Sequence, residues 1–184
     1  MLHPNFNPFP ILHTERLILK EITPEDAPAL YALRTNQEIM RYIDRPIPDS
    51  ESEVMELIEK MKLMKERGEG ISWGIFKKEE PSHKIGNIGL FRIIAEHYRA
   101  EIGYMIAKDE QRKGYTLEAI RAVVDYGFHQ LQVHSIEANI NPANNASRQL
   151  LLKAGFVQEA YFRENYYFNG QFIDSEIYSL LNKG

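Results

Sequence analysis

The residues best suited to chemistry form a short basic turn, Gln111-Arg112-Lys113-Gly114-Tyr115-Thr116. An alternating apolar run over residues 101–106 precedes this turn and predicts a strand. Apolar residues at helical spacing, from Leu117 to Leu131, follow it and predict an amphipathic helix. A helix start carries unpaired amides and roughly half a positive charge, to which Arg112 and Lys113 add two cations. The combination predicts a cradle for a phosphate group.

Other phosphate-binding motifs do not fit this turn. Gly114 is not followed by Lys-Ser or Lys-Thr, as in a Walker A loop, and no GxGxxG fingerprint follows a predicted strand. No acidic cluster suited to Mg²⁺ accompanies the turn, which disfavours a nucleotide-dependent transferase.

A second segment, residues 141–156, has the features of a capped helix. Asn141-Pro142 is a turn dipeptide that ends a predicted strand. Asn144 or Asn145 can cap the helix that follows, and Gly155 falls where a left-handed residue commonly ends one.

Together the two segments resemble the GNAT superfamily of acyl-CoA-dependent N-acyltransferases. Gln111-x-x-Gly114-x-Thr116 is similar to the Q/R-x-x-G-x-G/A signature of that family, with Thr116 where Gly or Ala is usual. Residues 141–156 are similar to its N-x-x-S … K-x-G-F block. Residues 14–26 and 162–178 resemble the opening and the closing hairpin of the RimJ/RimL-like branch. Members of that branch acetylate protein N-terminal amines or small-molecule amines.

The resemblance implies acetyl-CoA as the cofactor and places its binding on two strand residues, the basic turn and the second helix. The implied cofactor-binding residues are Met105, Ile106, Gln111, Arg112, Lys113, Gly114, Tyr115, Thr116, Asn144 and Ser147. The methyl group of Thr116 can crowd a phosphate, so the affinity for the cofactor is the property that this departure affects.

Acyl transfer to an amine needs the two reactants positioned together, which supplies several kcal/mol. A carboxylate base adds about 10²–10⁴-fold. By resemblance to a strand glutamate that serves as the base in some GNAT enzymes, Glu101 is the first candidate, and Glu164 is the alternative. Glu101 has a second interpretation, as a solvated or ion-paired strand carboxylate with Arg92 or Arg99 as its partner.

Ser147 is the candidate to meet the thiol sulfur. Many GNAT enzymes carry a Tyr at the position of Leu151, and a leucine cannot donate a proton. RimJ/RimL-like members instead carry the serine that matches Ser147. A serine in the first turn of a helix also commonly bonds backbone amides. Asn144 is open to binding the pantetheine arm, to capping the helix, or to both.

The predicted elements follow the order β-α-α-β-β-β-α-β-α-β-β. Strands are expected at residues 15–22, 72–77, 84–94, 99–106 and 135–140, with two more around Asn169-Gly170. Besides the two helices already described, one begins at Pro24 and one runs from Ser50 to about Arg67. This order predicts an α/β (α+β) fold with a mixed, mainly antiparallel sheet of six to seven strands and helices on both faces. Trp73 and the aromatic residues of 161–168 are expected in core or edge packing. Without a linker or repeat, residues 1–184 are expected to form a single N-acetyltransferase-like domain.

Composition narrows the function independently. A net charge of -4 disfavours nucleic acid as the main partner, and no apolar run approaches a membrane span. The absence of cysteine excludes disulfides, thiolate metal sites and a cysteine nucleophile. The histidines show no ligand spacing, so no metal is expected. The first ten residues lack the pattern of a secretory signal, and we expect a cytoplasmic protein, monomeric or homodimeric.

Three functions compete. The leading one is direct acetyl transfer from acetyl-CoA to a primary amine, foremost a protein or peptide N-terminal α-amine of the ribosomal-protein kind. A polyamine or an antibiotic is the alternative acceptor. The second function is a non-catalytic acyl-CoA-binding module, and the third is the nucleotide-dependent transferase disfavoured above.

Overall fold

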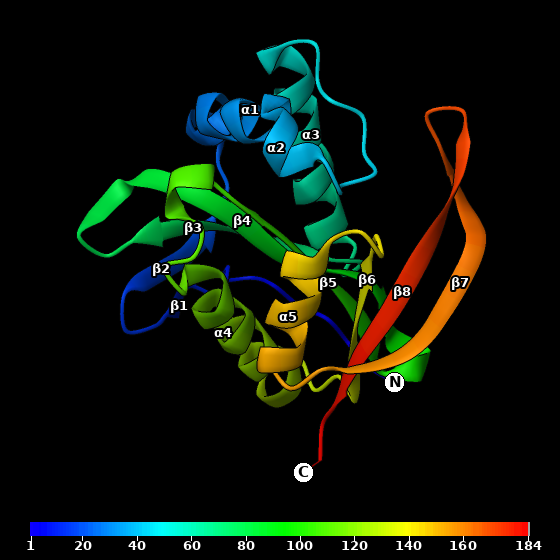
Figure 1. Ribbon diagram of the computed structural model, residues 1–184. Helices are drawn as coiled ribbons and strands as arrows, with labels where there is room; N and C mark the ends of the chain where they lie inside the picture. Colours follow the sequence, from blue (N-terminus) through cyan, green and yellow to red (C-terminus); the bar gives the residue numbers. More distant parts are fainter. Residues whose placement is uncertain (184) are drawn as a thin grey trace.

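A single eight-stranded sheet organises the chain (Figure 1). The structure, a computed structural model, describes residues 1–183. The strands lie in the order β1-β2-β3-β4-β5-β6-β8-β7, and every neighbouring pair is antiparallel except β5 with β6. Their bounds are β1 Leu12–His13, β2 Leu17–Glu21, β3 Ile71–Lys77, β4 Glu80–Ile94, β5 Arg99–Ile106, β6 Ser135–Ile140, β7 Val157–Phe168 and β8 Gln171–Leu181.

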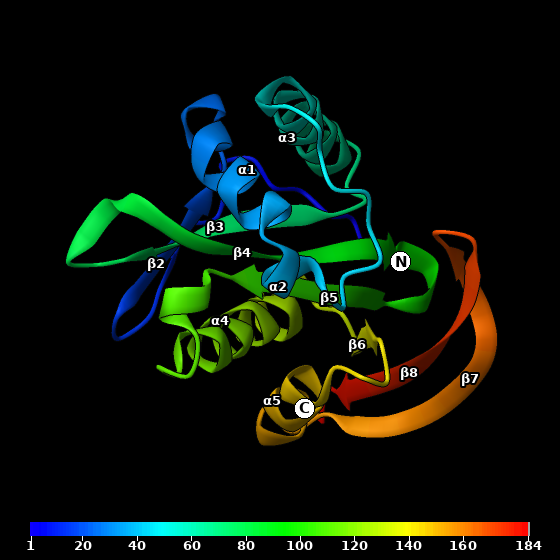
Figure 2. The ribbon, with the colours of Figure 1, turned by 45° about the horizontal axis from the view of Figure 1, so that its top comes forward.

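Helices cover both faces of the sheet (Figure 2). The helices α1 (Ala27–Thr35), α2 (Gln37–Met40) and α3 (Glu51–Glu66) lie on one face. The helices α4 (Tyr115–His129) and α5 (Asn145–Lys153) lie on the other. The larger hydrophobic core forms under α4 and α5 and includes the fully buried Trp73. We refer to these two sides as the α1–α3 face and the α4–α5 face.

Local sequence signals explain where several elements begin and end. The Ser50 hydroxyl accepts a hydrogen bond from the Glu53 amide at 3.4 Å, which caps α3. Asn144 caps α5 in the same way, and Gly155 follows that helix with φ of 95°. Asn169 and Gly170 both have positive φ, as the two-residue turn between β7 and β8 requires. The predicted capping signals and the closing hairpin are therefore confirmed.

The structure differs from the expected elements at five places. The two-residue strand β1 and the one-turn helix α2 were not predicted, because segments this short have no detectable periodicity. The predicted start of α1 at Pro24 is a 3₁₀ turn, and the α-helix begins at Ala27. The strand β4 begins at Glu80 and not at the expected residue 84, since Lys77 already pairs with Glu80.

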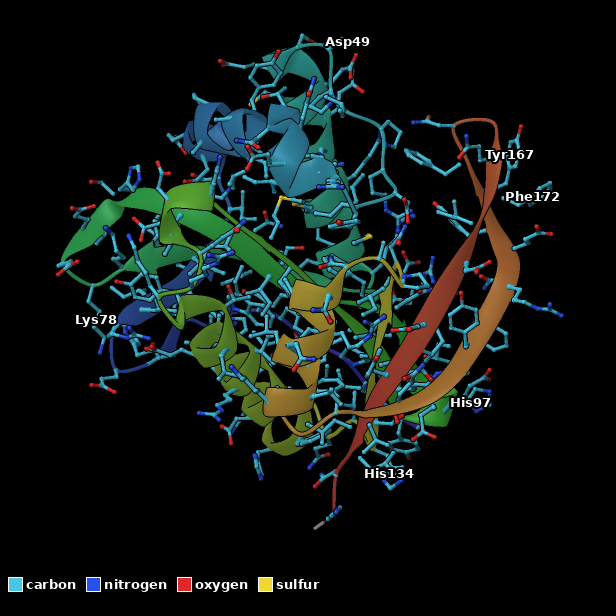
Figure 3. The ribbon with its side chains drawn as sticks, viewed as in Figure 1. Asp49, Lys78, His97, His134, Tyr167 and Phe172 are labelled. Atoms are coloured by element: carbon cyan, nitrogen blue, oxygen red, sulfur yellow. The ribbon has the colours of Figure 1, made fainter. Side chains whose placement is uncertain are left out.

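The fifth difference concerns the aromatic run in β7. Tyr161, Phe162 and Tyr167 are each about half exposed or more, so they are not core residues. Beyond the body of the sheet, β7 and β8 continue as a curved hairpin whose outer end carries Tyr167 and Phe172 (Figure 3). The two strands there pack mainly against each other, and an aromatic-rich sequence cannot indicate that its strand extends past the sheet.

Lys84, on β4, is a buried cation without a hydrogen-bonding partner among residues 1–183. Its side chain is 4% exposed, and its Nζ makes no hydrogen bond. Burial lowers the pKa of Lys84 from the ordinary 10.5 to about 8, against the attraction of Asp26. Because the unfolded chain holds this proton more tightly, the fold loses stability as pH falls from 10.5 to about 8.

We therefore expect Lys84→Met to stabilise the protein at pH 7, by up to about 3 kcal/mol for a shift of this size. The advantage over the parent should shrink as pH rises from 8 toward 10.5, where the lysine becomes neutral in both states. Urea unfolding at several pH values measures both effects. The matched control is Lys78→Met, at the exposed β3–β4 turn (Figure 3), which should change little. A Lys84→Met variant with parental stability throughout this pH range would contradict the assignment.

Candidate functional site

The site begins where the two central parallel strands separate. β5 and β6 pair only through Arg99–Ser135, Ala100–Ile136 and Glu101–Glu137. Both strands continue, β5 to Ile106 along β4 and β6 to Ile140 along β8, but no ladder joins their second halves. Backbone groups along both inner edges are therefore free to bond a ligand. We call the space between these unpaired halves of β5 and β6 the opening. The helix α4 follows β5 and α5 follows β6, both on the same side of the sheet (Figure 2).

The basic turn sits at the end of the opening and starts α4. Arg112 and Gly114 adopt left-handed φ values of 62° and 85°, and Gly114 caps the helix. A Cβ on Gly114 would lie 3.2 Å from the Nη2 of Arg16, so a side chain here would be both strained and crowded. The first amides of α4 are left without carbonyl partners inside the helix, which makes this end suited to an anion.

A cluster that sequence reasoning missed fixes the start of α4 to β2. The Glu118 carboxylate accepts hydrogen bonds from the Thr14 hydroxyl (2.5 Å), the Arg16 amide (2.8 Å) and the Arg16 Nε (2.7 Å). Burial acts to raise the pKa of Glu118, but these hydrogen bonds and the Arg16 charge outweigh it and lower the pKa. Arg16 also donates to the carbonyl of Lys113 (2.9 Å) and lies over the Tyr115 ring (4.5 Å). The Thr14-Glu15-Arg16 segment, noted only as a resemblance, was the available signal.

The two cations of the turn are not equivalent. Lys113 forms an ion pair with Glu110 at 3.0 Å, and Glu110 also pairs with Lys77 at 3.3 Å. Arg112 is exposed and has no ion pair within the described part of the chain. Arg112 is therefore the cation of the turn that is free to meet an anionic ligand.

A pair of hydroxyl groups spans the opening on the α4–α5 face. The Tyr104 hydroxyl of β5 lies 2.7 Å from the Ser147 Oγ of α5, and Ser147 is 8% exposed. Burial raises the pKa of the Tyr104 phenol to about 12, with the Ser147 bond acting in the opposite direction. Sequence reasoning singled out Ser147 but treated Tyr104 only as part of an apolar strand face.

The remaining predicted cofactor residues lie on β5, at the basic turn and at the start of α5. Asn144 accepts a hydrogen bond from the Ser147 amide at 3.1 Å, so its capping role is observed. Leu151 is fully buried, as expected for a leucine that faces the core. Met105 and Ile106 end β5 and are buried, and Gln111 and Thr116 flank the left-handed turn.

Glu101 lies on the opposite side of the sheet from Tyr104 and Ser147. It shares its side of β5 with Met105, which packs with Leu33 of α1 and Met40 of α2, so it lies on the α1–α3 face. Its Oε2 accepts a hydrogen bond from Arg92 at 2.9 Å, so the ion pair considered from the sequence is present. The other oxygen has no hydrogen bond among residues 1–183. Glu164, the alternative base, is an exposed residue with φ of 50° in the outer part of β7, and its amide donates to Asp174.

A loop and the curved hairpin meet above the α1–α3 face. The Tyr166 hydroxyl of β7 donates to the Asp44 carbonyl at 3.3 Å and accepts from the Nη1 of Arg45 at 3.2 Å. Burial raises the pKa of Asp44, while a hydrogen bond from Asn141 and the charge of Arg45 act to lower it. The loop after α2 therefore contacts both the hairpin and the end of β6, and it bounds the face that carries Glu101.

The site therefore combines a parallel strand pair that separates, a helix start suited to an anion and a hydroxyl pair that joins β5 to α5. A family profile described as Acetyltransferase (GNAT) domain matches residues 16–157. The chain belongs to the GNAT acetyltransferase family and is an N-acetyltransferase of that type.

Relatives cover almost the entire chain. The uncharacterized N-acetyltransferase YoaA of Bacillus subtilis (strain 168) is 39% identical over 94% of this chain and 97% of its own length. The structure of a putative ribosomal-protein-serine acetyltransferase from Vibrio cholerae has a TM-score of 0.83 at 25% identity, covering 95% of this chain and 99% of that one. Spermidine N-acetyltransferase from Vibrio cholerae, in complex with CoA and spermine, has a TM-score of 0.79 at 26% identity, covering 90% and 95%. The predicted family and fold are confirmed, and the named relatives leave the acceptor open.

No helix within residues 1–183 combines the length and the apolar character that crossing a membrane takes.

Arg112→Glu should weaken CoA binding at least about tenfold, because it replaces a charge-assisted contact with repulsion at the helix start. The salt dependence of binding should also fall. Calorimetric titration at two salt concentrations measures both, and the melting temperature should stay within about 1 °C of the parent since Arg112 is exposed. Arg121→Glu, an exposed reversal further along α4, is the matched control. Equal losses in the two variants would mean that net charge, not the turn, governs binding.

Proposed function

We propose that the protein transfers the acetyl group of acetyl-CoA directly to the α-amine of a protein or peptide N-terminus. The observation that carries this proposal is the parted edge of β5 and β6 leading to the start of α4, with Arg112 unpaired beside it. That combination suits a ligand with amide groups at one end and phosphates at the other.

The residues present fit acetyl-CoA at each part of the opening. The amides of Tyr115 and Thr116, with Arg112, can hold the pyrophosphate. The unpaired edge that includes Met105 and Ile106 can bond the amides of the pantetheine arm as an added strand does. Such an arm would run past the Tyr104–Ser147 pair, which places hydroxyl donors beside the sulfur. The thioester carbonyl would then reach between the strands toward the side that carries Glu101.

On the acceptor side, Glu101 has the geometry of a base that works directly or through a water. One oxygen is held by Arg92, and the other has no partner among the described residues. Asn87 lies in register with Met105 on the same face, and its Oδ1 is buried without a hydrogen bond within residues 1–183. An amine with its N–H groups directed at these oxygens would satisfy both.

The charges on this face favour a monocationic acceptor over a polyamine. Glu101 is paired with Arg92, and Glu137 with Arg99 at 3.1 Å, so neither carboxylate offers an uncompensated charge. Arg34 of α1 donates to the Pro46 carbonyl in the loop after α2, which also contains Arg45. Burial, together with the charge of Arg45, lowers the pKa of Arg34. A polycation would meet little negative potential here, whereas a peptide offers carbonyl acceptors to arginines.

The basicity of the acceptor points the same way. An α-amine titrates near 8 and a lysine near 10.4, so a neutral lysine at pH 7 costs about 3 kcal/mol more. A single arginine-paired carboxylate offsets only part of that cost.

Glu101→Gln should lower kcat/KM about 10²-fold, because the amide cannot take the proton of the acceptor ammonium. The residual activity should rise more steeply with pH, since only the pre-formed neutral amine then reacts. Glu137→Gln is a matched control, since Glu137 is the register partner of Glu101 and pairs with an arginine in the same way. A Glu101→Gln variant with parental rates would remove Glu101 from the mechanism and leave the acetyltransferase assignment in place.

An acceptor screen tests the substrate class directly. Peptides with N-terminal Ser or Ala should give higher kcat/KM than spermidine, an aminoglycoside or the same peptides with a blocked N-terminus and an internal lysine. Release of free thiol from acetyl-CoA measures the rate. If spermidine outcompetes every peptide, the polyamine alternative replaces this proposal. If CoA binds but no amine is acetylated, the non-catalytic alternative replaces it.

A further inference from the structure

We propose that Tyr104 is a positioning residue that directs the Ser147 hydroxyl at the thiol sulfur of coenzyme A. The inference rests on the proposed function, because it takes the sulfur to lie beside Ser147. Nothing in the sequence motifs assigned Tyr104 a role, and its hydroxyl is the group within hydrogen-bonding distance of the Ser147 Oγ, at 2.7 Å.

The first step of the argument is the direction of this hydrogen bond. A phenol is a far stronger acid than an aliphatic alcohol and is therefore the better donor. If Ser147 donated to Tyr104, the phenolic hydrogen would need another acceptor, and none is present within residues 1–183. With Tyr104 as the donor, the Ser147 oxygen accepts the hydrogen bond of the phenol. The hydrogen of the Ser147 hydroxyl is then free to point in another direction.

The second step is where that hydrogen can point. Ser147 is held at two points: its backbone amide donates to the Asn144 side chain at 3.1 Å, and its side-chain oxygen is bonded to Tyr104. Tyr104 belongs to β5 and Ser147 to α5, which follows β6, so the bond crosses the space where the two strands separate. The hydrogen of the Ser147 hydroxyl is therefore available to donate to a group held inside the opening, in the path proposed for the pantetheine arm.

The third step is what the pair does during transfer. As the acceptor nitrogen bonds to the acetyl carbon, the carbon–sulfur bond breaks and its electron pair stays on sulfur. The proton of the amine leaves through Glu101 to solvent. The thiolate accepts the hydrogen bond of Ser147, which Tyr104 strengthens by polarising the Ser147 oxygen. Released coenzyme A takes its proton from solvent, so the step balances without a charged donor at the sulfur.

Tyr104 itself is not suited to give up its proton. Burial raises the pKa of the phenol to about 12, well above that of a thiol. The phenol therefore keeps its proton while the thiolate forms. A positioning residue must do so, whereas a general acid would give its proton to the sulfur.

A double-mutant cycle separates this role from simple packing. At saturating acetyl-CoA and with an N-terminal peptide as acceptor, Ser147→Ala should lower kcat by about 10²-fold, as loss of an oxyanion donor does. Tyr104→Phe should lower kcat by a smaller factor, about tenfold, with KM for acetyl-CoA little changed. The double variant should be no slower than Ser147→Ala, because Tyr104 acts through the serine. If the loss of kcat in the double variant equalled the product of the two single losses, the two residues would act independently and the proposal would be overturned. An unchanged kcat in Tyr104→Phe would also overturn it.

The matched control is Tyr126→Phe. Tyr126 is a buried tyrosine of α4 whose ring packs edge-on against Trp73 at 5.4 Å, away from the hydroxyl pair. Its variant should keep the parental kcat, and melting temperatures of all variants show whether any loss of rate reflects unfolding.

A readout without turnover separates this proposal from the function on which it rests. The ultraviolet absorbance of the thiolate, followed by pH titration of bound coenzyme A, reports the thiol pKa in the site. That pKa should be lower in the parent protein than in Tyr104→Phe or Ser147→Ala. Equal values in the three proteins would overturn the positioning role while leaving the proposed function standing. A protein that binds no coenzyme A would overturn both.

Discussion

Three residue pairs decide the layout of the entire site. Arg99, Ala100 and Glu101 bond in parallel to Ser135, Ile136 and Glu137, and the ladder then stops although both strands continue. Unpaired backbone groups inside a sheet are costly unless a ligand or solvent satisfies them. The separation therefore persists only because each half of the sheet is held independently, β5 by β4 and β6 by β8.

Polar anchors keep the two halves apart as units. On one side, α5 is fixed to β8 by Arg148, which donates to both oxygens of the buried Glu176 at 2.9 and 3.1 Å, while Tyr178 donates a third bond at 3.0 Å. A bidentate ion pair, with a further hydrogen bond to the same carboxylate, offsets much of the free-energy cost of removing a buried carboxylate from water. On the other side, Glu118 and Arg16 fix α4 to β2.

The Glu118–Arg16 pair also settles an electrostatic conflict at the cradle. A carboxylate in the first turn stabilises a helix through its dipole, but it repels a phosphate at the same helix start. Arg16 neutralises Glu118 with two close contacts and at the same time bonds the carbonyl of Lys113. Glu110 has the same relation to Lys113 and Lys77. The helix α4 therefore keeps its contact with Arg16, and the unpaired Arg112 keeps the electrostatic potential at the turn positive.

Much of the fold followed from sequence because its signals are local. The Ser50 and Asn144 caps, the left-handed Gly155 and the Asn169-Gly170 turn each depend on a few neighbouring residues, and the structure has all of them. The Glu118 cluster and the Tyr104–Ser147 pair could not be found in this way, because their members are far apart in the chain. An alternating strand pattern shows only that Tyr104 lies on the apolar face of its strand. It does not show whether the Tyr104 hydroxyl has a hydrogen-bonding partner on a helix.

In the proposed reaction, the sheet separates the group that meets the sulfur from the group that takes the proton of the amine, and each group suits the burial of its own face. On the α4–α5 face the hydroxyl pair, with Ser147 buried and Tyr104 partly buried, is neutral and so avoids the cost of desolvating a charge. On the α1–α3 face Glu101 keeps partial access to solvent, with a side chain 24% exposed, and has a charged partner in Arg92. A carboxylate so placed can pass a proton to water, whereas one beside the sulfur would repel the thiolate. The proposed chemistry therefore depends on the opening between β5 and β6, through which one small acyl group would reach from the first environment to the second.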